Sequence, residues 1–298
     1  MHEAIATGAP AVVRPAVAVA MRPARQNWRW RLVGHLTIAL LVLIVGIPLY
    51  WMAIASLKSL PEIYTFPPTW LPANPRWANF SQAWQSAPFE RFYMNSIITT
   101  VLTSIAKLFN AVLSAYALSY LRFPGREAVF VVILGALMIP TQVVVLPNYL
   151  TVAGLGWINT YQGIIVPEAG IAFGVFLLRQ HFLTLPRDVL DAARVDGCDH
   201  LRILFSIVLP LSRPILATLV MLTAVDRWND YLWPLVVTTT KEMRTLPIGI
   251  AWMHDVEGNT QWGVVMAGVI LVILPVLVLF AWTQKHLVEG IASGAVKG

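Results

Sequence analysis

Charged residues are scarce in this sequence. Only 12% of its 298 residues are Asp, Glu, Lys or Arg, whereas 57% are hydrophobic. A soluble domain carries about 25% charged residues, and several apolar stretches here approach twenty residues, which is the length that crosses a bilayer. The shortage of charge therefore argues against an ordinary soluble domain and indicates an all-α polytopic membrane protein.

Cysteine and the common catalytic motifs are also rare or missing. The single cysteine, Cys198, excludes an intrachain disulfide framework and a zinc site built from several thiolates. The sequence contains no GxxxxGK[ST] nucleotide-binding loop, no HExxH motif and no GxSxG motif, and its six histidines are scattered. We therefore expect no catalytic, cofactor-binding or metal site in this chain.

Six apolar stretches are long enough to cross roughly 30 Å of hydrocarbon at about 1.5 Å per residue. The second, fourth and fifth contain charged residues and are predicted to be amphipathic. The six predicted spans are Leu32–Leu57, Met94–Leu121, Val129–Leu150, Tyr161–Phe182, Ile215–Thr238 and Val264–Trp282.

The distribution of Lys and Arg predicts the orientation. With the N-terminus inside, fourteen of the 21 basic residues fall in cytoplasmic segments and five in outside segments. Cytoplasmic loops carry the excess of Lys and Arg, so both termini are predicted to lie in the cytoplasm. The net charge of +6 is explained by this topology rather than by nucleic-acid binding. Residues 1–27, rich in Ala, Pro and Arg, are predicted to form a disordered cytoplasmic tail ahead of a transmembrane domain over 28–298.

One polar stretch, Leu185–Pro214, interrupts the apolar chain with four acids and four arginines in thirty residues. Pro186 suits the first turn of a helix, and Gly197 suits a left-handed C-cap. Asp199 is placed to cap a second helix that extends to Phe205, before Pro210 and Pro214 turn the chain back. The pattern predicts a cytoplasmic helix, a glycine bend and a second helix.

The spacing inside this stretch resembles the EAA loop of ABC importer permeases. Asp191 stands where that family has Glu, and the shorter side chain keeps the charge. The resemblance implies a type I importer permease fold, with a coupling helix between spans four and five that docks on a cytosolic ATPase. The residues that match the loop are Asp191, Ala192, Ala193, Asp196, Gly197, Ile207, Leu209 and Pro210.

Further segments narrow the resemblance to the second permease of maltose-type carbohydrate importers. These segments are FLLRQHFLTLP at 176–186, WNDYLWP at 228–234 and the tail at 290–298. EGNTQWGVVMA at 257–267 looks like permeases for sn-glycerol 3-phosphate and its glycerophosphodiesters, such as glycerophosphocholine. A di- or oligosaccharide is the alternative cargo.

The resemblance also implies the partners of the chain. They are a homologous second permease, an ATP-binding cassette ATPase dimer that binds ATP and Mg²⁺, and an extracytoplasmic substrate-binding protein, all at the bacterial cytoplasmic membrane with its lipid. The tail at Gly290–Lys297 is a possible second contact with the ATPase.

Ionisable residues at bilayer depth indicate where a transport path runs, because they are costly there and usually face a water-filled cavity or a partner. An intersubunit contact or a structural ion pair explains them equally well. Lys107 and Asn110 in span two either line the path or lie near a helix end, where Lys107 can snorkel. The candidate pathway residues are Glu168, Asp226, Arg227, Trp228, Asn229, Asp230 and Tyr231.

Two other function classes remain as alternatives. An ion-coupled secondary carrier would use Glu168 and Asp226 as relay groups, but it leaves the spacing of the EAA-like loop unexplained. An intramembrane enzyme lacks a recognisable motif in this sequence. A permease that takes its energy from a separate ATPase fits the sequence best.

Overall fold

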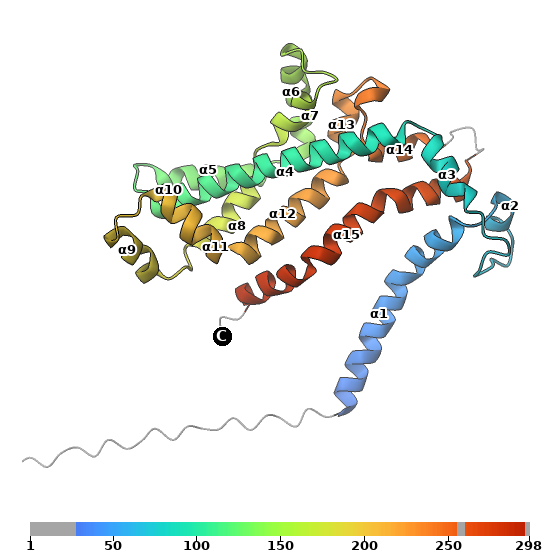
Figure 1. Ribbon diagram of the computed structural model, residues 1–298, viewed down its shortest axis with the longest axis horizontal. Coiled ribbons are helices and arrows are strands. Elements are labelled where there is room, and N and C mark those ends of the chain that lie inside the picture. The colour runs from blue at the N-terminus through green and yellow to red at the C-terminus, as the bar shows by residue number, and fades with distance from the viewer. Residues whose placement is uncertain (1–27, 255–259, 296–298) are drawn as a thin grey trace, which may run out of the picture. The chain divides into compact units, whose positions relative to one another are not determined.

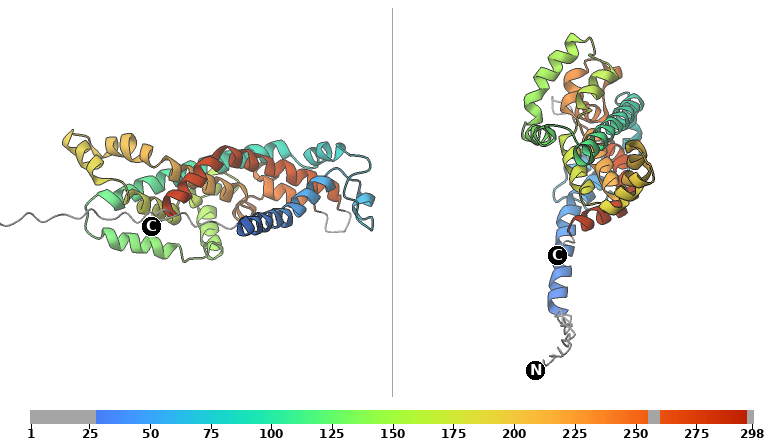
Figure 2. Two further views of the ribbon diagram at one scale, coloured as in Figure 1. Left: turned by 90° about the horizontal axis from the view of Figure 1, so that it is seen from below. Right: turned by 90° about the vertical axis from the view of Figure 1, so that its left-hand side faces the viewer.

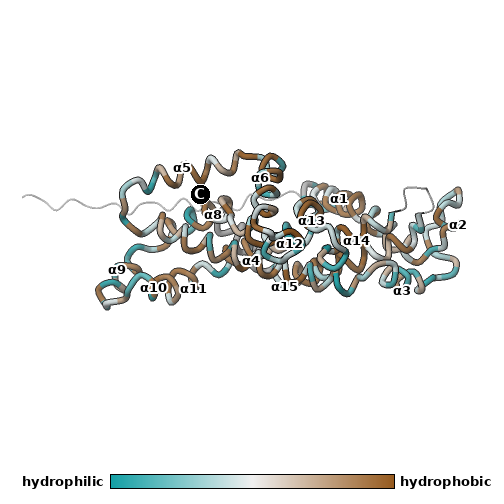
Figure 3. Tube along the Cα trace, turned by 90° about the horizontal axis from the view of Figure 1, so that it is seen from above, coloured by the Kyte–Doolittle hydropathy of each residue, from teal (hydrophilic) through white to brown (hydrophobic). Residues whose placement is uncertain are grey.

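The computed structural model describes residues 28–254 and 260–295, and these residues form helices and loops without a strand. The predicted disordered tail lies outside the described residues. The chain divides into two units, residues 1–50 and 51–298, and helix α1 (Trp28–Ala55) begins in the first and ends in the second. Hydrophobic colouring covers most of α1 (Figure 3), in agreement with the first predicted span.

Three helices among the described residues are long and apolar enough to cross a membrane, and they agree with the first, second and sixth predicted spans. They are α1, α4 (Phe89–Tyr120) and α15 (Trp262–Ala295). Three further crossings are possible only if each bent pair of helices counts as one span.

The third predicted span is not one straight helix. Helices α5 (Arg126–Ala136) and α6 (Thr141–Gly154) meet at 99°. Pro140 lies at the break, and proline disfavours a helical conformation in the residue before it. The apolar run that suggested a single crossing is therefore folded back at this point.

The fourth span bends by 44° and the fifth ends early. Helix α7 (Tyr161–Ile165) continues as η1 (Val166–Glu168) and is followed by α8 (Ala172–Phe182). Helix α12 (Arg213–Trp228) stops before the predicted end of span five, and α13 (Leu232–Val237) follows as a separate helix. Pro234 explains this break, because in a continuous helix its ring would clash with the carbonyl of Asp230.

Within residues 51–298, α4 packs along α8 and α12, and α12 packs against α15 (Figures 1 and 2). Helices α9 (Arg187–Val195) and α10 (His200–Ile203) lie at one end of α4. Helices α2 (Leu60–Ile63), α3 (Ala78–Gln85), η3 (Lys241–Met243) and α14 (Leu246–Trp252) lie toward the other end.

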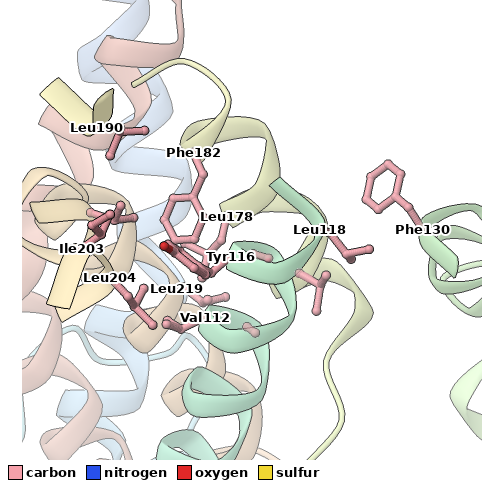
Figure 4. Packing of buried hydrophobic residues seen from close by; sticks show 14 of the residues in the cluster. Val112, Tyr116, Leu118, Phe130, Leu178, Phe182, Leu190, Ile203, Leu204 and Leu219 are labelled. Atoms are coloured by element: carbon pink, nitrogen blue, oxygen red, sulfur yellow. The ribbon is translucent and has the colours of Figure 1, made fainter. Parts of the chain in front are cut away.

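The largest buried cluster of apolar side chains joins the α9–α10 end to the helix bundle (Figure 4). Tyr116 of α4, Phe182 of α8, Leu190 of α9 and Leu204 meet there, each less than 10% exposed. Burial of apolar surface is favourable by about 25 cal/mol per Å², so this core fixes the base of α9 to the bundle.

Candidate translocation site and coupling loop

Five charged side chains gather halfway along α4. Lys107 of α4 lies 3.8 Å from Glu168 and 3.6 Å from Asp226, measured between Nζ and the nearest carboxylate oxygen. Arg227 pairs with Glu168 at 2.6 Å, with Asp226 at 2.9 Å and with Asp230 at 3.1 Å. We call these five residues the charge cluster.

The breaks in the helices place these groups together. Glu168 ends η1, just before the bend to α8, while Asp226 and Arg227 lie in the last turn of α12 and Asp230 lies beyond it. Two cations face three carboxylates, so the cluster carries a formal charge of −1 when all five groups are ionised. Ionised groups at this depth require such pairing.

Exposure differs across the charge cluster. The Lys107 side chain is 7% exposed and that of Arg227 is 15%, whereas the Asp226 side chain is 60% exposed. Lys107 is therefore buried and ion-paired rather than snorkelling to a helix end, and Asn110 lies on an exposed face. The cluster presents a carboxylate, rather than an ammonium or guanidinium group, to a solute on its open side.

The remaining candidate pathway residues are not part of the charge cluster. Trp228 is buried, and its Nε1 donates to the carbonyl of Val272 on α15 at 2.9 Å. Asn229 caps α12 and donates to the Val225 carbonyl at 2.8 Å. Tyr231 is 41% exposed in the break between α12 and α13.

A buried polar stripe on α4 was not among the sequence predictions. Asn95 donates to the carbonyls of Glu242 and Arg244 at 2.8 and 2.9 Å, and Tyr161 donates to its Oδ1 at 2.8 Å. Ser96 accepts from the backbone N–H of Leu246 at 2.9 Å. The polar residues of this stripe recur at intervals of three and four positions, so the sequence alone could have indicated that they share one helix face. Of its members, only Lys107 was singled out from the sequence. The buried members of this stripe are Asn95, Ser96, Thr99, Thr100, Thr103, Ser104 and Lys107.

The EAA-like stretch has the predicted bend, with two local differences. Gly197 has φ +77°, the left-handed conformation expected of a helix C-cap residue, and Asp199 accepts from the N–H of Arg202 at 2.8 Å. Pro186 is the N-cap of α9 rather than a first-turn residue. The second helix was predicted to end at Phe205, but it continues through the π-helical η2 (Leu204–Val208) and α11 (Leu209–Leu211). Pro210 therefore lies inside this helix, and the chain turns at Ser212 instead.

The two faces of α9 differ. Leu190 and Ala193 are buried in the apolar core, so of the two alanines only Ala192 remains exposed and accessible to a partner. Asp191 is exposed and forms an ion pair with Arg194 at 2.8 Å. Asp196 and Gly197 are exposed in the bend, Ile207 and Leu209 are half-buried, and Pro210 is exposed.

Exposed apolar side chains surround the bend. Val195 is 87% exposed and Leu201 and Phe205 are exposed as well. Such side chains, mixed with exposed charges, are typical of a surface that another protein covers. Among the described residues no group of three or more His, Cys, Asp and Glu side chains is arranged to hold a metal ion.

Comparison with known proteins is consistent with this geometry. Residues 107–293 match the family model of the binding-protein-dependent transport system inner membrane component. The chain is 36% identical over 264 residues to the sn-glycerol-3-phosphate transport system permease protein UgpE of Yersinia pestis. This alignment covers 86% of the chain and 94% of the relative. It is 38% identical over 208 residues to the arabinooligosaccharides transport system permease protein AraQ of Bacillus subtilis, covering 70% and 74%.

A solved structure has the same fold. A chain of a bacterial ABC transporter involved in the import of the acidic polysaccharide alginate aligns with a TM-score of 0.78 at 25% identity, covering 89% of this chain and 99% of that one. The chain therefore belongs to the family of binding-protein-dependent transport system inner membrane components, and it is an ABC importer permease of the carbohydrate type, a non-catalytic transport subunit.

Proposed function

We propose that this chain forms half of the translocation pathway of an ATP-driven importer in a bacterial cytoplasmic membrane. A homologous second permease forms the other half, and an extracytoplasmic binding protein delivers the solute. ATP and Mg²⁺ bind to a cytosolic ATPase dimer, for which α9 is the docking helix. The observation that carries this proposal is the helix–glycine–helix surface at 187–211, exposed on one face and anchored in the core on the other.

The anchoring supports transmission of movement. Leu190 of α9 packs with Tyr116 and Phe182 in the buried core. Tyr116 also lies 3.1 Å from Nδ1 of His200, measured from its hydroxyl oxygen, and Tyr120 donates to the Phe182 carbonyl at 2.5 Å. Close-packed contacts transmit displacement, so an ATPase that moves α9 also moves the end of α4. The same helix carries Lys107 of the charge cluster near its middle.

Gly197 provides a test with a matched control. Gly197 and Gly156 have φ of +77° and +70°, each N–H donates to the carbonyl three residues earlier at 3.0 Å, and neither has an atom within 4 Å of a built Cβ. Proline forces φ to about −65°, so Gly197→Pro and Gly156→Pro disturb the backbone similarly. We expect Gly197→Pro, like Asp191→Arg, to abolish uptake while the protein stays in the membrane.

Gly156→Pro should retain at least half of wild-type uptake, measured in membrane vesicles with the binding protein and ATP. Wild-type uptake in both Gly197→Pro and Asp191→Arg would contradict the coupling assignment. Uptake that persists without the ATPase would instead indicate the ion-coupled carrier, with Glu168 and Asp226 as relay groups.

The cargo we propose is sn-glycerol 3-phosphate or a glycerophosphodiester such as glycerophosphocholine. The extent of the match to a glycerol-3-phosphate permease supports this choice. The exposed carboxylate of Asp226 is compatible with the choline cation of a diester, whereas the anionic phosphate requires positive charge from the partner permease.

A di- or oligosaccharide is the second candidate. The formal charge of −1 on the charge cluster favours a hydroxylated solute without a phosphate, and an arabinooligosaccharide permease is among the relatives. Calorimetry on the binding protein of the same importer separates the two. Retention of glycerophosphocholine or glycerol 3-phosphate supports the first cargo, and retention of a disaccharide alone rejects it.

A further inference from the structure

A basic cavity lies beside α9, apart from the charge cluster. It encloses about 300 Å³ between the end of α4, the loop 121–125, the end of α8 and α9. Its charged lining consists of Arg122, Arg126, Arg187, Arg194 and one acid, Asp191. Four guanidinium groups around one small cavity give it a strongly positive potential.

The neighbouring acids neutralise only part of this positive charge. Arg194 pairs with Asp191 at 2.8 Å, and Arg126 pairs with Glu127 at 3.0 Å. Glu127 is shared, because Arg179 also binds it at 2.9 Å.

Arg122 and Arg187 are exposed, and neither forms an ion pair within the described part of the chain. Arg122 also lines the two adjoining cavities around the 121–125 loop, one of them with Arg194 and His200. Arg122 therefore lines all three cavities.

Most of the uncharged residues that line the cavity are apolar or aromatic. Tyr120, Phe182, Leu183, Leu185 and Leu190 line it. Tyr120 ends the membrane-spanning helix α4 and Phe182 ends α8, so the cavity lies where spans end and lipid headgroups begin. Arginines beside an apolar wall at this depth suit a ligand with a charged phosphate and an apolar body.

We propose that this cavity binds a phosphate group, supplied by the headgroup of an anionic phospholipid. A guanidinium donates two parallel hydrogen bonds to phosphate oxygens, which a lysine cannot do. The bound phosphate bridges Arg122, next to α4, and Arg187, in the first turn of α9. It thereby fastens α9 to the bundle and makes the coupling loop responsive to the lipid composition of the membrane. This role does not depend on the identity of the cargo.

The test measures binding to the full-length chain in detergent micelles by native mass spectrometry. The probes are dihexanoylphosphatidylglycerol, dihexanoylphosphatidylcholine and sn-glycerol 3-phosphate. The test variant is Arg122→Gln/Arg187→Gln. The matched control is Arg202→Gln/Arg213→Gln, which removes two exposed arginines of the same polar stretch that do not line the cavity. Arg122→Lys/Arg187→Lys keeps the charge but loses the bidentate geometry.

We expect phosphatidylglycerol to bind about tenfold more tightly than phosphatidylcholine. The Gln pair should lose this preference, the control pair should keep it, and the Lys pair should retain part of it. Glycerol 3-phosphate that binds with the same dependence on Arg122 and Arg187, and competes with the lipid, would keep the phosphate site but reject the lipid as its source.

Phosphatidylglycerol binding that is equal in wild type and the Gln pair, or no stronger than phosphatidylcholine binding, would overturn the proposal. If the Gln pair fails to fold, Arg122→Gln and Arg187→Gln are measured separately. Each should weaken binding about threefold, and an unchanged affinity in both would equally overturn the proposal.

Discussion

Arg227 holds three carboxylates with one guanidinium. Its bonds to Glu168, Asp226 and Asp230 join η1, α12 and the break that follows α12. Because Arg227 and Asp230 are each less than one-fifth exposed, water replaces these bonds only in part. The residue therefore has a structural role in addition to its place beside the candidate pathway.

Arg227→Gln should lower the free energy of unfolding by about 2–3 kcal/mol, because Lys107 is then the one cation left beside three carboxylates among the residues that the structure describes. Adding Glu168→Gln should restore about 1–2 kcal/mol of this loss. Unfolding in mixed micelles, followed by tryptophan fluorescence, measures both. The exposed Arg76→Gln is the control and should change stability by less than about 0.5 kcal/mol. Additive losses in the double variant would show that the Arg227–Glu168 contact is not energetically coupled.

At the scale of elements, α14 packs closely against α4, because the backbone of Gly249 in α14 lies directly against the ring of Phe92 in α4. A Cβ at Gly249 would lie 2.5 Å from Cδ2 of Phe92, which is fully buried. Asn95 of α4 donates to the carbonyls of Glu242 and Arg244 just before α14, and Ser96 accepts from the N–H of Leu246, the first residue of α14. The glycine is therefore required by packing, since its own backbone is helical.

Two alanine substitutions should change stability in opposite directions. Gly135 lies in helix α5 with no atom within 4 Å of a built Cβ, so Gly135→Ala should stabilise by about 0.5–1 kcal/mol through helix propensity. Gly249→Ala should destabilise by about 1–3 kcal/mol, because the buried Phe92 ring must shift. The same unfolding measurement compares the two. Stabilisation by Gly249→Ala would show that Phe92 yields without cost.

At the scale of the whole molecule, the single cysteine reports on orientation. Cys198 lies in the bend between α9 and α10 and is partly exposed. The excess of basic residues predicts that this bend lies in the cytoplasm, and the proposed ATPase would cover it. Labelling of Cys198 tests both the orientation and the docking in the wild-type protein, because the sequence has a single cysteine.

A membrane-impermeant maleimide should label Cys198 in inside-out vesicles and leave it unlabelled in right-side-out vesicles. Assembly with the ATPase should slow labelling about tenfold or more, because docking on α9 would bury the bend. Cys198→Ser/Ala73→Cys moves the thiol to an exposed position between α2 and α3, and its labelling should show the opposite sidedness. Labelling of Cys198 in right-side-out vesicles would reverse the orientation.

The sequence by itself determined the helical membrane class, the three predicted spans that form single long helices and the bend at Gly197. These follow from local rules, namely apolar length, the φ +77° that glycine tolerates and the capping geometry of Asp199. The spacing around Asp191 also identified the family that the comparisons show.

Only the tertiary structure decided which charges meet. Lys107 and Arg227 are 120 residues apart in sequence, and no periodicity relates them to Glu168. A proline by itself does not decide where a helix breaks, because Pro48 and Pro147 lie inside helices whereas the chain breaks near Pro140 and Pro234. Tertiary packing also decided that Ala193 and Trp228 are buried. The burial of a side chain depends on neighbours that are distant in the sequence.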